Sequence, residues 1–215
     1  MEDGRGKSII DGAMGDRVDY LGPYREAARR HGAGFESLLW ASPQTQAARF
    51  EAFERLVEFE GRSVLDVGCG RADFLDFLVG REIRVASYVG IEGVAELAAA
   101  ARAKGHRNAQ IIEADFVAEP GRMFVGAQLV AISGALNTLD SAGFYATLRR
   151  AFEAASEALV FNFLSSERLA GTSYLRWHRR EEVIGFIGTL SGRFVVVEDY
   201  LAGDCTVAVG KEIQG

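Results

Sequence analysis

Residues 64–73, which read VLDVGCGRAD, decide the fold that we expect. An apolar strand, Val64 to Val67, runs into a Gly-x-Gly turn at Gly68 and Gly70, and a helix is predicted directly after the turn. Glycine lets a backbone turn sharply and approach a ligand, since no side chain intervenes. The free N–H groups at the start of a helix then favour an anionic or polar ligand. The stretch predicts a ligand-binding unit, although a tight turn without a ligand has the same pattern.

Short apolar strands alternate with helices after this unit, which favours a parallel sheet covered on both faces. The last two predicted strands, 193–200 and 204–209, are joined by only three residues. Such a short link forces an antiparallel hairpin, because a parallel crossover needs a dozen residues or more. We therefore expect an α/β fold with a seven-stranded, mostly parallel sheet. Its other strands are predicted at 64–67, 84–91, 109–113, 129–133 and 158–164, with helices at 72–79, 95–103, 141–156 and 181–190.

The chain ahead of the sheet has a different pattern. Residues 1–16 are rich in glycine, aspartate and charge without a sustained period, and we expect them to be a mobile tail. Residues 17–61 predict a helical cover, whose clearest helix starts at Ser42-Pro43 and ends at Gly61. The predicted α/β domain then spans residues 62–215.

Composition limits the class of protein. The chain has 215 residues, 48% of them apolar and 25% charged, which is typical of a globular protein and excludes a disordered or collagen-like one. Its net charge of −6 disfavours DNA as a partner. Cys69 and Cys205 lie far apart, form no metal-binding spacing and favour a reducing compartment. With no signal peptide or membrane-length apolar run, we expect a cytoplasmic protein without a metal or membrane partner. The sequence pattern specifies no oligomeric state.

Acidic residues follow the next two strands of the predicted sheet. Glu92 closes the second strand, where a carboxylate can accept hydrogen bonds from both hydroxyls of a ribose. Asp115 closes the third, where it can accept from an adenine amino group while Phe116 lies beside the ring. Either acid alone is more often a solvated turn residue or a helix cap. Together they lie at the sheet edge where open α/β folds bind ligands, so they predict a nucleoside site.

Over residues 62–211 the sequence resembles the class I S-adenosylmethionine-dependent methyltransferases, and LDVGCG at 65–70 is its most diagnostic string. The resemblance implies a Rossmann-like sheet with the closing hairpin, S-adenosylmethionine as the cofactor, and residues 62–215 as a methyltransferase domain. It also implies that Asp66, Gly68 and Gly70 line the methionine part of the cofactor. Ala72 departs from the family, which usually has a third glycine there. The cofactor-binding candidates are Arg49, Asp66, Gly68, Cys69, Gly70, Glu92, Gly93, Asp115, Phe116, Ser133 and Gly134.

The fourth predicted strand runs into the unusual string SGALN at 133–137. The resemblance implies that the sulfonium and the acceptor meet at Ser133, Gly134 and Asn137. The family's Asn-Pro-Pro-Tyr string is missing, which argues against amino methylation of DNA or of protein glutamine. Asn137 fits a helix cap or a turn at least as well as an acceptor contact.

Residues 40–50, WASPQTQAARF, are similar to a Ser…Gln…Arg-Phe pattern in small bacterial methyltransferases of unassigned substrate. The strings SGxxN at 133–137 and FNFLSS at 161–166 support the same resemblance. Gln46 and Arg49 share one face of the predicted helix. Arg49 could reach the cofactor carboxylate, a pairing that guanidinium geometry favours. A salt bridge to neighbours between Glu51 and Glu54, or contact with solvent, fits equally well.

No general base stands out. In-line methyl transfer depends on alignment, and a base is needed only when the acceptor carries a proton at the reacting moment. His178 could be that base because an imidazole titrates near neutral pH, but a lone histidine among arginines is more often a surface residue. We expect methyl transfer to a small-molecule acceptor by in-line displacement. The substrate-binding candidates are Trp40, Asn137, Tyr174 and His178, although Trp40 fits a packing role as well.

Two other functions share part of this pattern. An NAD(P)-binding oxidoreductase has the same glycine turn and acidic strand end, but Asp66, Asp115 and the terminal hairpin favour the methyl donor. A catalytically silent module of the same fold would act through protein interaction. Such modules often lose the glycine turn or the acidic ribose ligand, and both are present here.

Overall fold

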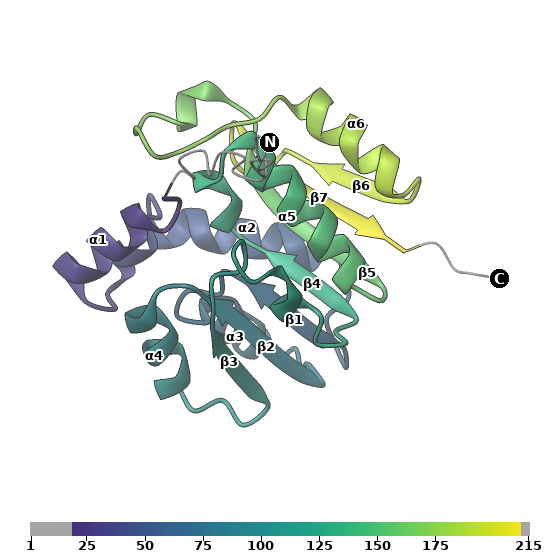
Figure 1. Cartoon of the computed structure of the whole chain (residues 1–215). Helices are drawn as coiled ribbons and strands as arrows, with labels where there is room; N and C mark the ends of the chain where they lie inside the picture. Colours follow the sequence, from purple (N-terminus) through teal and green to yellow (C-terminus); the bar gives the residue numbers. More distant parts are fainter. Residues whose placement is uncertain (1–18, 212–215) are drawn as a thin grey trace, which may run out of the picture.

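A computed structural model of the chain describes residues 19–211, so the tail predicted at 1–16 lies outside the described residues. Figure 1 shows one layered α/β arrangement in which helices flank a central sheet. The elements are α1 (Gly22–His31), η1 (Phe35–Leu38), α2 (Pro43–Leu56), β1 (Ser63–Val67), α3 (Asp73–Gly80), β2 (Ser87–Glu92), α4 (Ala95–Ala103), β3 (Ala109–Glu113), η2 (Pro120–Met123), β4 (Leu129–Ile132), η3 (Ala135–Thr138), α5 (Ser141–Ala154), β5 (Ala158–Leu164), η4 (Glu167–Leu169), α6 (Arg180–Leu190), β6 (Phe194–Val197) and β7 (Asp204–Gly210).

The sheet has seven strands in the order β3-β2-β1-β4-β5-β7-β6. Strands β1 to β5 pair in parallel, and β7 runs antiparallel between β5 and β6. This confirms the predicted α/β class, the mostly parallel sheet and the terminal hairpin. Because the carboxyl ends of β1 to β5 lie at one edge, the segments that follow these strands meet there.

Three element boundaries differ from the sequence prediction by three residues or more. The hairpin link has six residues, 198–203, because β6 ends at Val197 instead of at 200. Strand β2 starts at Ser87 instead of at 84. Helix α2 ends at Leu56 rather than at Gly61, since Val57 is already extended and Phe59 turns inward to meet the ring of Phe74 at 5.3 Å.

Local sequence explains how two of the helices begin. Ser42 and Thr45 form a capping box at the start of α2, where the Ser42 side chain accepts from the Thr45 N–H. Asp140 caps α5 by accepting from the Gly143 N–H at 2.7 Å. Ala72, just before α3, has φ +58°, the left-handed region that glycine adopts more easily. The missing family glycine therefore leaves about 1 kcal/mol or more of backbone strain at this turn.

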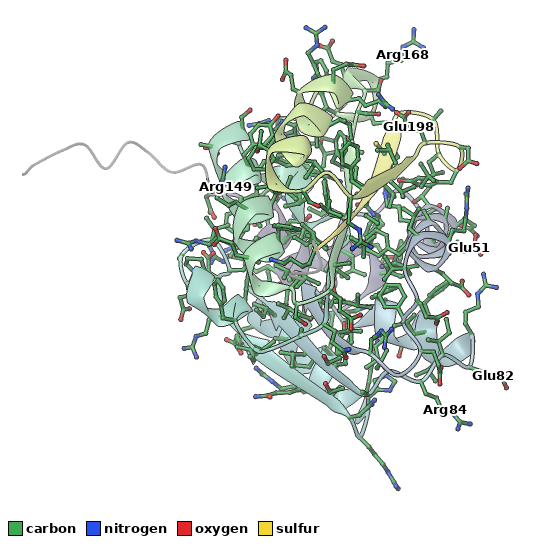
Figure 2. The ribbon with its side chains drawn as sticks, turned by 90° about the vertical axis from the view of Figure 1, so that its right-hand side faces the viewer. Glu51, Glu82, Arg84, Arg149, Arg168 and Glu198 are labelled. Carbon is green, nitrogen blue, oxygen red and sulfur yellow. The ribbon has the colours of Figure 1, made fainter. Side chains whose placement is uncertain are left out.

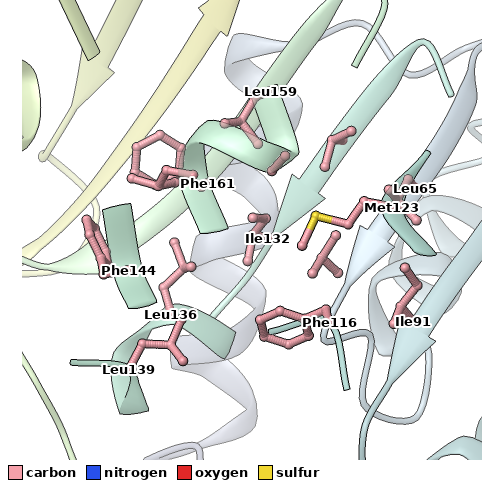
Figure 3. Close-up of a cluster of buried hydrophobic side chains, with 14 of the residues drawn as sticks. Leu65, Ile91, Phe116, Met123, Ile132, Leu136, Leu139, Phe144, Leu159 and Phe161 are labelled. Carbon is pink, nitrogen blue, oxygen red and sulfur yellow. The ribbon is translucent and has the colours of Figure 1, made fainter. Parts of the chain in front are cut away.

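Two apolar clusters cover the two faces of the sheet. Alternate residues of β1 enter different clusters: Val64 packs with Phe53 and Phe74 under α2 and α3, whereas Leu65 belongs to the larger cluster. Figure 3 shows that larger cluster, in which Phe144 of α5 lies near Leu136 and Phe161. Both faces are therefore buried, as a parallel sheet requires.

The outside of the molecule is charged. Figure 2 shows six labelled side chains pointing away from the body, and all six are exposed: Glu51, Glu82, Arg84, Arg149, Arg168 and Glu198. Within residues 19–211, none of the helices has the length and apolar character needed to cross a membrane.

Candidate functional site

A cavity of about 770 Å³ lies at the carboxyl ends of the parallel strands. Its volume is within the range of about 300–1,000 Å³ that is typical of small-molecule sites. We call the part formed by the ends of β1, β2 and β3 the strand-end half, and the part formed by α1 to α2 and by the segments after β4 and β5 the cover half. The strand-end half is represented by Asp66, Gly68, Gly70, Glu92 and Phe116, and the cover half by Phe35, Trp40, Arg49, Asn137 and Tyr174.

The glycine turn exposes backbone to the cavity. Gly68 and Gly70 have φ of +73° and +56°, which glycine adopts without strain. A Cβ on Gly68 would lie 2.3 Å from the Cβ of Ala135, so no side chain fits between β1 and the segment after β4. Cys69, between the two glycines, is buried and also lines the cavity.

Glu92 holds the turn and faces the cavity. One of its carboxylate oxygens accepts from the Gly70 N–H and the other from the Val94 N–H, each at 2.8 Å. The side chain is buried, and burial raises the pKa of its carboxyl. A carboxylate offers about four lone-pair positions, so the two that the backbone leaves free can accept from ligand hydroxyls.

Asp66 is a buried acid without a cation. It is 3% exposed, the Tyr88 hydroxyl donates to it, and no ion pair joins it to any residue within 19–211. Burial raises the pKa of Asp66 to about 7, while the hydrogen bond from Tyr88 opposes this shift. A cationic ligand group beside Asp66 would favour its charged form and lower this pKa.

Two predicted cofactor contacts, Asp115 and Gly93, do not line the cavity. Asp115 caps its own turn: Oδ1 accepts from the Val117 and Ala118 N–H groups at 2.9 and 3.0 Å and from the Tyr20 hydroxyl. Gly93 lies beneath Leu21, whose Cδ1 would be 2.8 Å from a Cβ at position 93.

Phe116, next to Asp115, does line the cavity, with the ring of Tyr20 5.5 Å away. The N-terminal cover therefore reaches this end of the site.

Arg49 faces the cavity from α2, yet its partner is Asp204. Nε donates to Asp204 Oδ2 at 2.7 Å and Nη2 donates to the same oxygen, while the Tyr200 hydroxyl donates to Oδ1. The Trp40 ring lies 4.7 Å from the guanidinium carbon. The predicted salt bridge between Arg49 and its neighbours from Glu51 to Glu54 was wrong, because Glu51 and Glu54 pair with Arg81 instead. Asp204 is 155 residues away, so no local signal could have identified it.

The segment after β4 is held by a residue that the sequence analysis did not single out. Asn162 of β5 accepts from the Gly134 N–H at 3.0 Å and donates to the Ser133 hydroxyl at 3.1 Å. Gly134 has φ +76°, and a Cβ there would meet the Trp40 ring at 2.7 Å. Ser133, Gly134 and Asn137 all line the cavity. FNFLSS at 161–166 contains Asn162, but the string does not reveal its partners.

The prediction that His178 is a surface residue was wrong. The ring is buried, stacks on Phe144 with centroids 3.9 Å apart, and does not line the cavity. A role of His178 as a base or as a substrate contact stays a prediction. Burial lowers the pKa of His178. Its backbone N–H donates to Leu164 O, which anchors the segment that carries Tyr174 into the cavity.

Comparison with known proteins gives a clear result for structure only. Neither models of protein families nor curated proteins match the chain. Among solved structures, the magnesium protoporphyrin IX methyltransferase ChlM from Synechocystis PCC 6803 with bound SAH has a TM-score of 0.65 and 13% identity, over 91% of this chain and 98% of that one. A DhpI–SAM–HEP complex has a TM-score of 0.66 and 14% identity, over 91% and 99%. A SAM-dependent methyltransferase from Aquifex aeolicus has a TM-score of 0.57 and 18% identity, over 79% and 93%.

The chain has the fold of the class I S-adenosylmethionine-dependent methyltransferases. The strand order supports this independently. A doubly wound dinucleotide-binding sheet has the order 3-2-1-4-5-6, whereas here the antiparallel β7 lies between β5 and β6.

Proposed function

We propose that the protein transfers a methyl group from S-adenosylmethionine to a small-molecule acceptor by in-line displacement. The observation that carries this proposal is a single cavity that the glycine turn, Glu92 and Phe116 share with Ser133 and Gly134. Its two halves can hold two ligands side by side, one over the strand ends and one beneath the cover.

The charges of the cavity suit the cofactor. S-adenosylmethionine carries a sulfonium, an ammonium and a carboxylate, so its net charge is positive. Among the described residues that line the cavity, four are acidic, Glu36, Asp66, Asp73 and Glu92, and Arg49 is the one cation. Opposite charges in a partly buried site attract strongly, so this lining favours a cationic ligand.

The residues take distinct roles toward that cofactor. Asp66 binds the ammonium, Glu92 accepts from the ribose hydroxyls, and Phe116 packs against the adenine ring. Arg49 binds the carboxylate through Nη1, which has no hydrogen bond to another residue within 19–211, while Nε and Nη2 stay with Asp204. Asp115 supports the site without lining it, because it caps the turn from which Phe116 enters the cavity.

The chemistry depends on alignment. Bound S-adenosylmethionine supplies a methyl group made electrophilic by the positive sulfur. The protein has to place the acceptor in line with it, and fixed positioning alone can supply several kcal/mol of the barrier. Asn162 fixes Ser133 and Gly134 at the point where the two halves meet. Of the described residues, no histidine lines the cavity.

The size and cover of the cavity support a small acceptor over a polymer. Segments of α1, η1 and α2 and the segment between β5 and α6 contribute to its lining. The net charge of −6 also opposes binding of a phosphate backbone. The oxidoreductase alternative is not favoured, because the antiparallel β7 makes the strand order differ from that of a dinucleotide-binding sheet. The silent module is not favoured, because Asp66 and Glu92 still line the cavity.

Calorimetric titration with S-adenosylmethionine, S-adenosylhomocysteine and NADH in parallel tests the proposal. We expect micromolar binding of the first two compounds and none of NADH. Binding of NADH alone would overturn the cofactor assignment. A protein that binds none of the three would instead be a module that acts through protein interaction.

A further inference from the structure

We infer that the acceptor is a neutral, planar, largely apolar molecule with a hydroxyl group that hydrogen-bonds to the Asn137 amide. This inference rests on the proposed function, because it assigns the strand-end half and Arg49 to the cofactor and the rest of the cover half to the acceptor. Three properties of the cover half carry it: largely apolar walls, one buried amide without a partner, and no cation among its described lining residues other than Arg49.

The walls of the cover half are apolar and partly aromatic. Rings come from η1, from the segment before α2 and from the segment after β5, which are far apart in sequence. Aromatic rings prefer offset or edge-to-face packing against another ring, so these walls favour a flat molecule. The wall residues are Phe35, Trp40, Leu164, Leu169, Tyr174 and Leu175.

Asn137 differs from the other polar residues of the cover half, such as Gln46 and Thr172, because its amide is buried without a hydrogen-bond partner. It is 7% exposed and lines the cavity, its Oδ1 is buried without a hydrogen-bond partner, and Nδ2 has no hydrogen bond to another residue within 19–211. Its backbone is fixed, since its N–H donates to Gly134 O and its carbonyl accepts from the Arg176 N–H.

A buried amide that makes no hydrogen bond is unfavourable, and a ligand that pairs with it removes that cost. The two ends of the amide exchange by a simple flip, so a donor or an acceptor can face the cavity. A hydroxyl group matches both orientations because it donates and accepts.

The charges of the cover half exclude an acidic acceptor. Arg49 is engaged by Asp204 and, in the proposed complex, by the cofactor carboxylate. Asp73 is paired with Lys104 and Arg71, so neither of those cations is free for an acceptor. A carboxylate or phosphate on the acceptor would therefore be buried near other acids without a counter-charge, which is strongly unfavourable.

Three probes that share one ring system test the inference: 2-naphthol, naphthalene and 2-naphthoate, each titrated calorimetrically into the protein with and without saturating S-adenosylhomocysteine. We expect 2-naphthol to bind about fivefold or more tightly than naphthalene, the effect of one hydrogen bond, and 2-naphthoate to bind least. In Asn137→Leu the advantage of 2-naphthol over naphthalene should disappear while S-adenosylhomocysteine binds as before. Gln110→Leu, which removes an exposed carboxamide on β3, should preserve the advantage.

Each outcome bears on one claim. Equal or tighter binding of 2-naphthoate, or an unchanged preference for 2-naphthol in Asn137→Leu, overturns the inference. If Asn137→Leu does not fold, the order of the three probes in the wild-type protein decides. Loss of S-adenosylhomocysteine binding with the naphthol preference intact counts against the proposed function and leaves the ligand class standing.

Discussion

In the strand-end half of the cavity Asp66 and Glu92 are buried without a cation, whereas in the cover half Asp204 is buried against Arg49. Without a ligand, Asp66 and Glu92 have no compensating positive charge, and their burial lowers the stability of the free protein. The pair of Asp204 and Arg49 satisfies its charge internally and ties α2 to β7. The same cavity thus combines a region suited to binding with a region that holds the molecule together, and the two should respond to substitution in opposite directions.

The largest effect should come from breaking the internal pair. Arg49→Leu leaves Asp204 buried without its cation, and we expect a loss of about 3–5 kcal/mol in the free energy of unfolding, measured by urea denaturation. Arg55→Leu, on the same helix, breaks the exposed pair with Asp199 and should leave the free energy of unfolding nearly unchanged, because solvent screens exposed ion pairs. Equal losses in the two variants would contradict a larger contribution of the buried pair than of the exposed pair to stability.

Asp66→Asn should have the opposite sign. The pKa of Asp66 is about 7 in the folded protein against 3.8 as its reference value, so the folded state binds the proton more tightly. This stabilisation is complete at low pH and is lost as the pH rises from about 4 to 7. Above pH 7 the asparagine variant should therefore be more stable than the wild-type protein, by at most about 4 kcal/mol.

The advantage of Asp66→Asn should shrink on acidification, to less than about 2 kcal/mol at pH 5, as followed by urea denaturation across this range. A difference between the two proteins that stays constant with pH would contradict a raised pKa for Asp66.

Substitutions of the acids in the strand-end half should also lower the affinity for the cofactor. Asp66→Ala and Glu92→Ala should each weaken S-adenosylmethionine binding by about 100-fold or more, because each removes charged hydrogen-bond partners, while both variants remain folded. Glu113→Ala is a matched control, since Glu113 lies opposite Glu92 in the sheet register but is exposed. Calorimetry checks affinity and circular dichroism checks folding. Unchanged affinity in both cavity variants would refute the site assignment.

The smallest effect concerns His178, which belongs to neither half. Burial lowers its pKa below the reference value of 6.5, so the folded state favours the neutral ring. Stability from this group is present above pH 6.5 and is lost as the pH falls below it. His178→Phe should retain the ring contact with Phe144 and reduce the loss of stability between pH 6.5 and 5, as followed by urea denaturation. Parallel pH profiles of the two proteins would show that His178 does not titrate in this way.

The strand-end half could be predicted from the sequence because short-range rules decide it. A strand, a glycine turn and a helix are contiguous at 64–73, and parallel pairing brings Glu92 and Phe116 to the same edge. The sheet and its hairpin followed from periodicity and link length in the same way. Two predicted contacts departed: Asp115 accepts from two backbone N–H groups within its own turn, and Gly93 lies beneath Leu21.

The cover half required the tertiary structure. Arg49 had acidic neighbours in sequence, but its helix faces β7 and Asp204 is the acid that is buried there. His178 looked exposed among arginines, yet the path from β5 to α6 turns its ring onto Phe144. Neither contact has a sequence period, because each joins segments whose approach is fixed only when the whole sheet forms.

The contacts of Leu21 with Gly93 and of Trp40 with Gly134 also bear on how such a chain can change over generations. In both places a large side chain of the cover occupies the space that a side chain of the sheet domain would need. This cover, placed on another sheet domain of the same fold, would therefore fit only where glycine occupies both of these positions. A larger residue at either position requires a smaller side chain in the cover, so changes in the two parts of the chain are coupled.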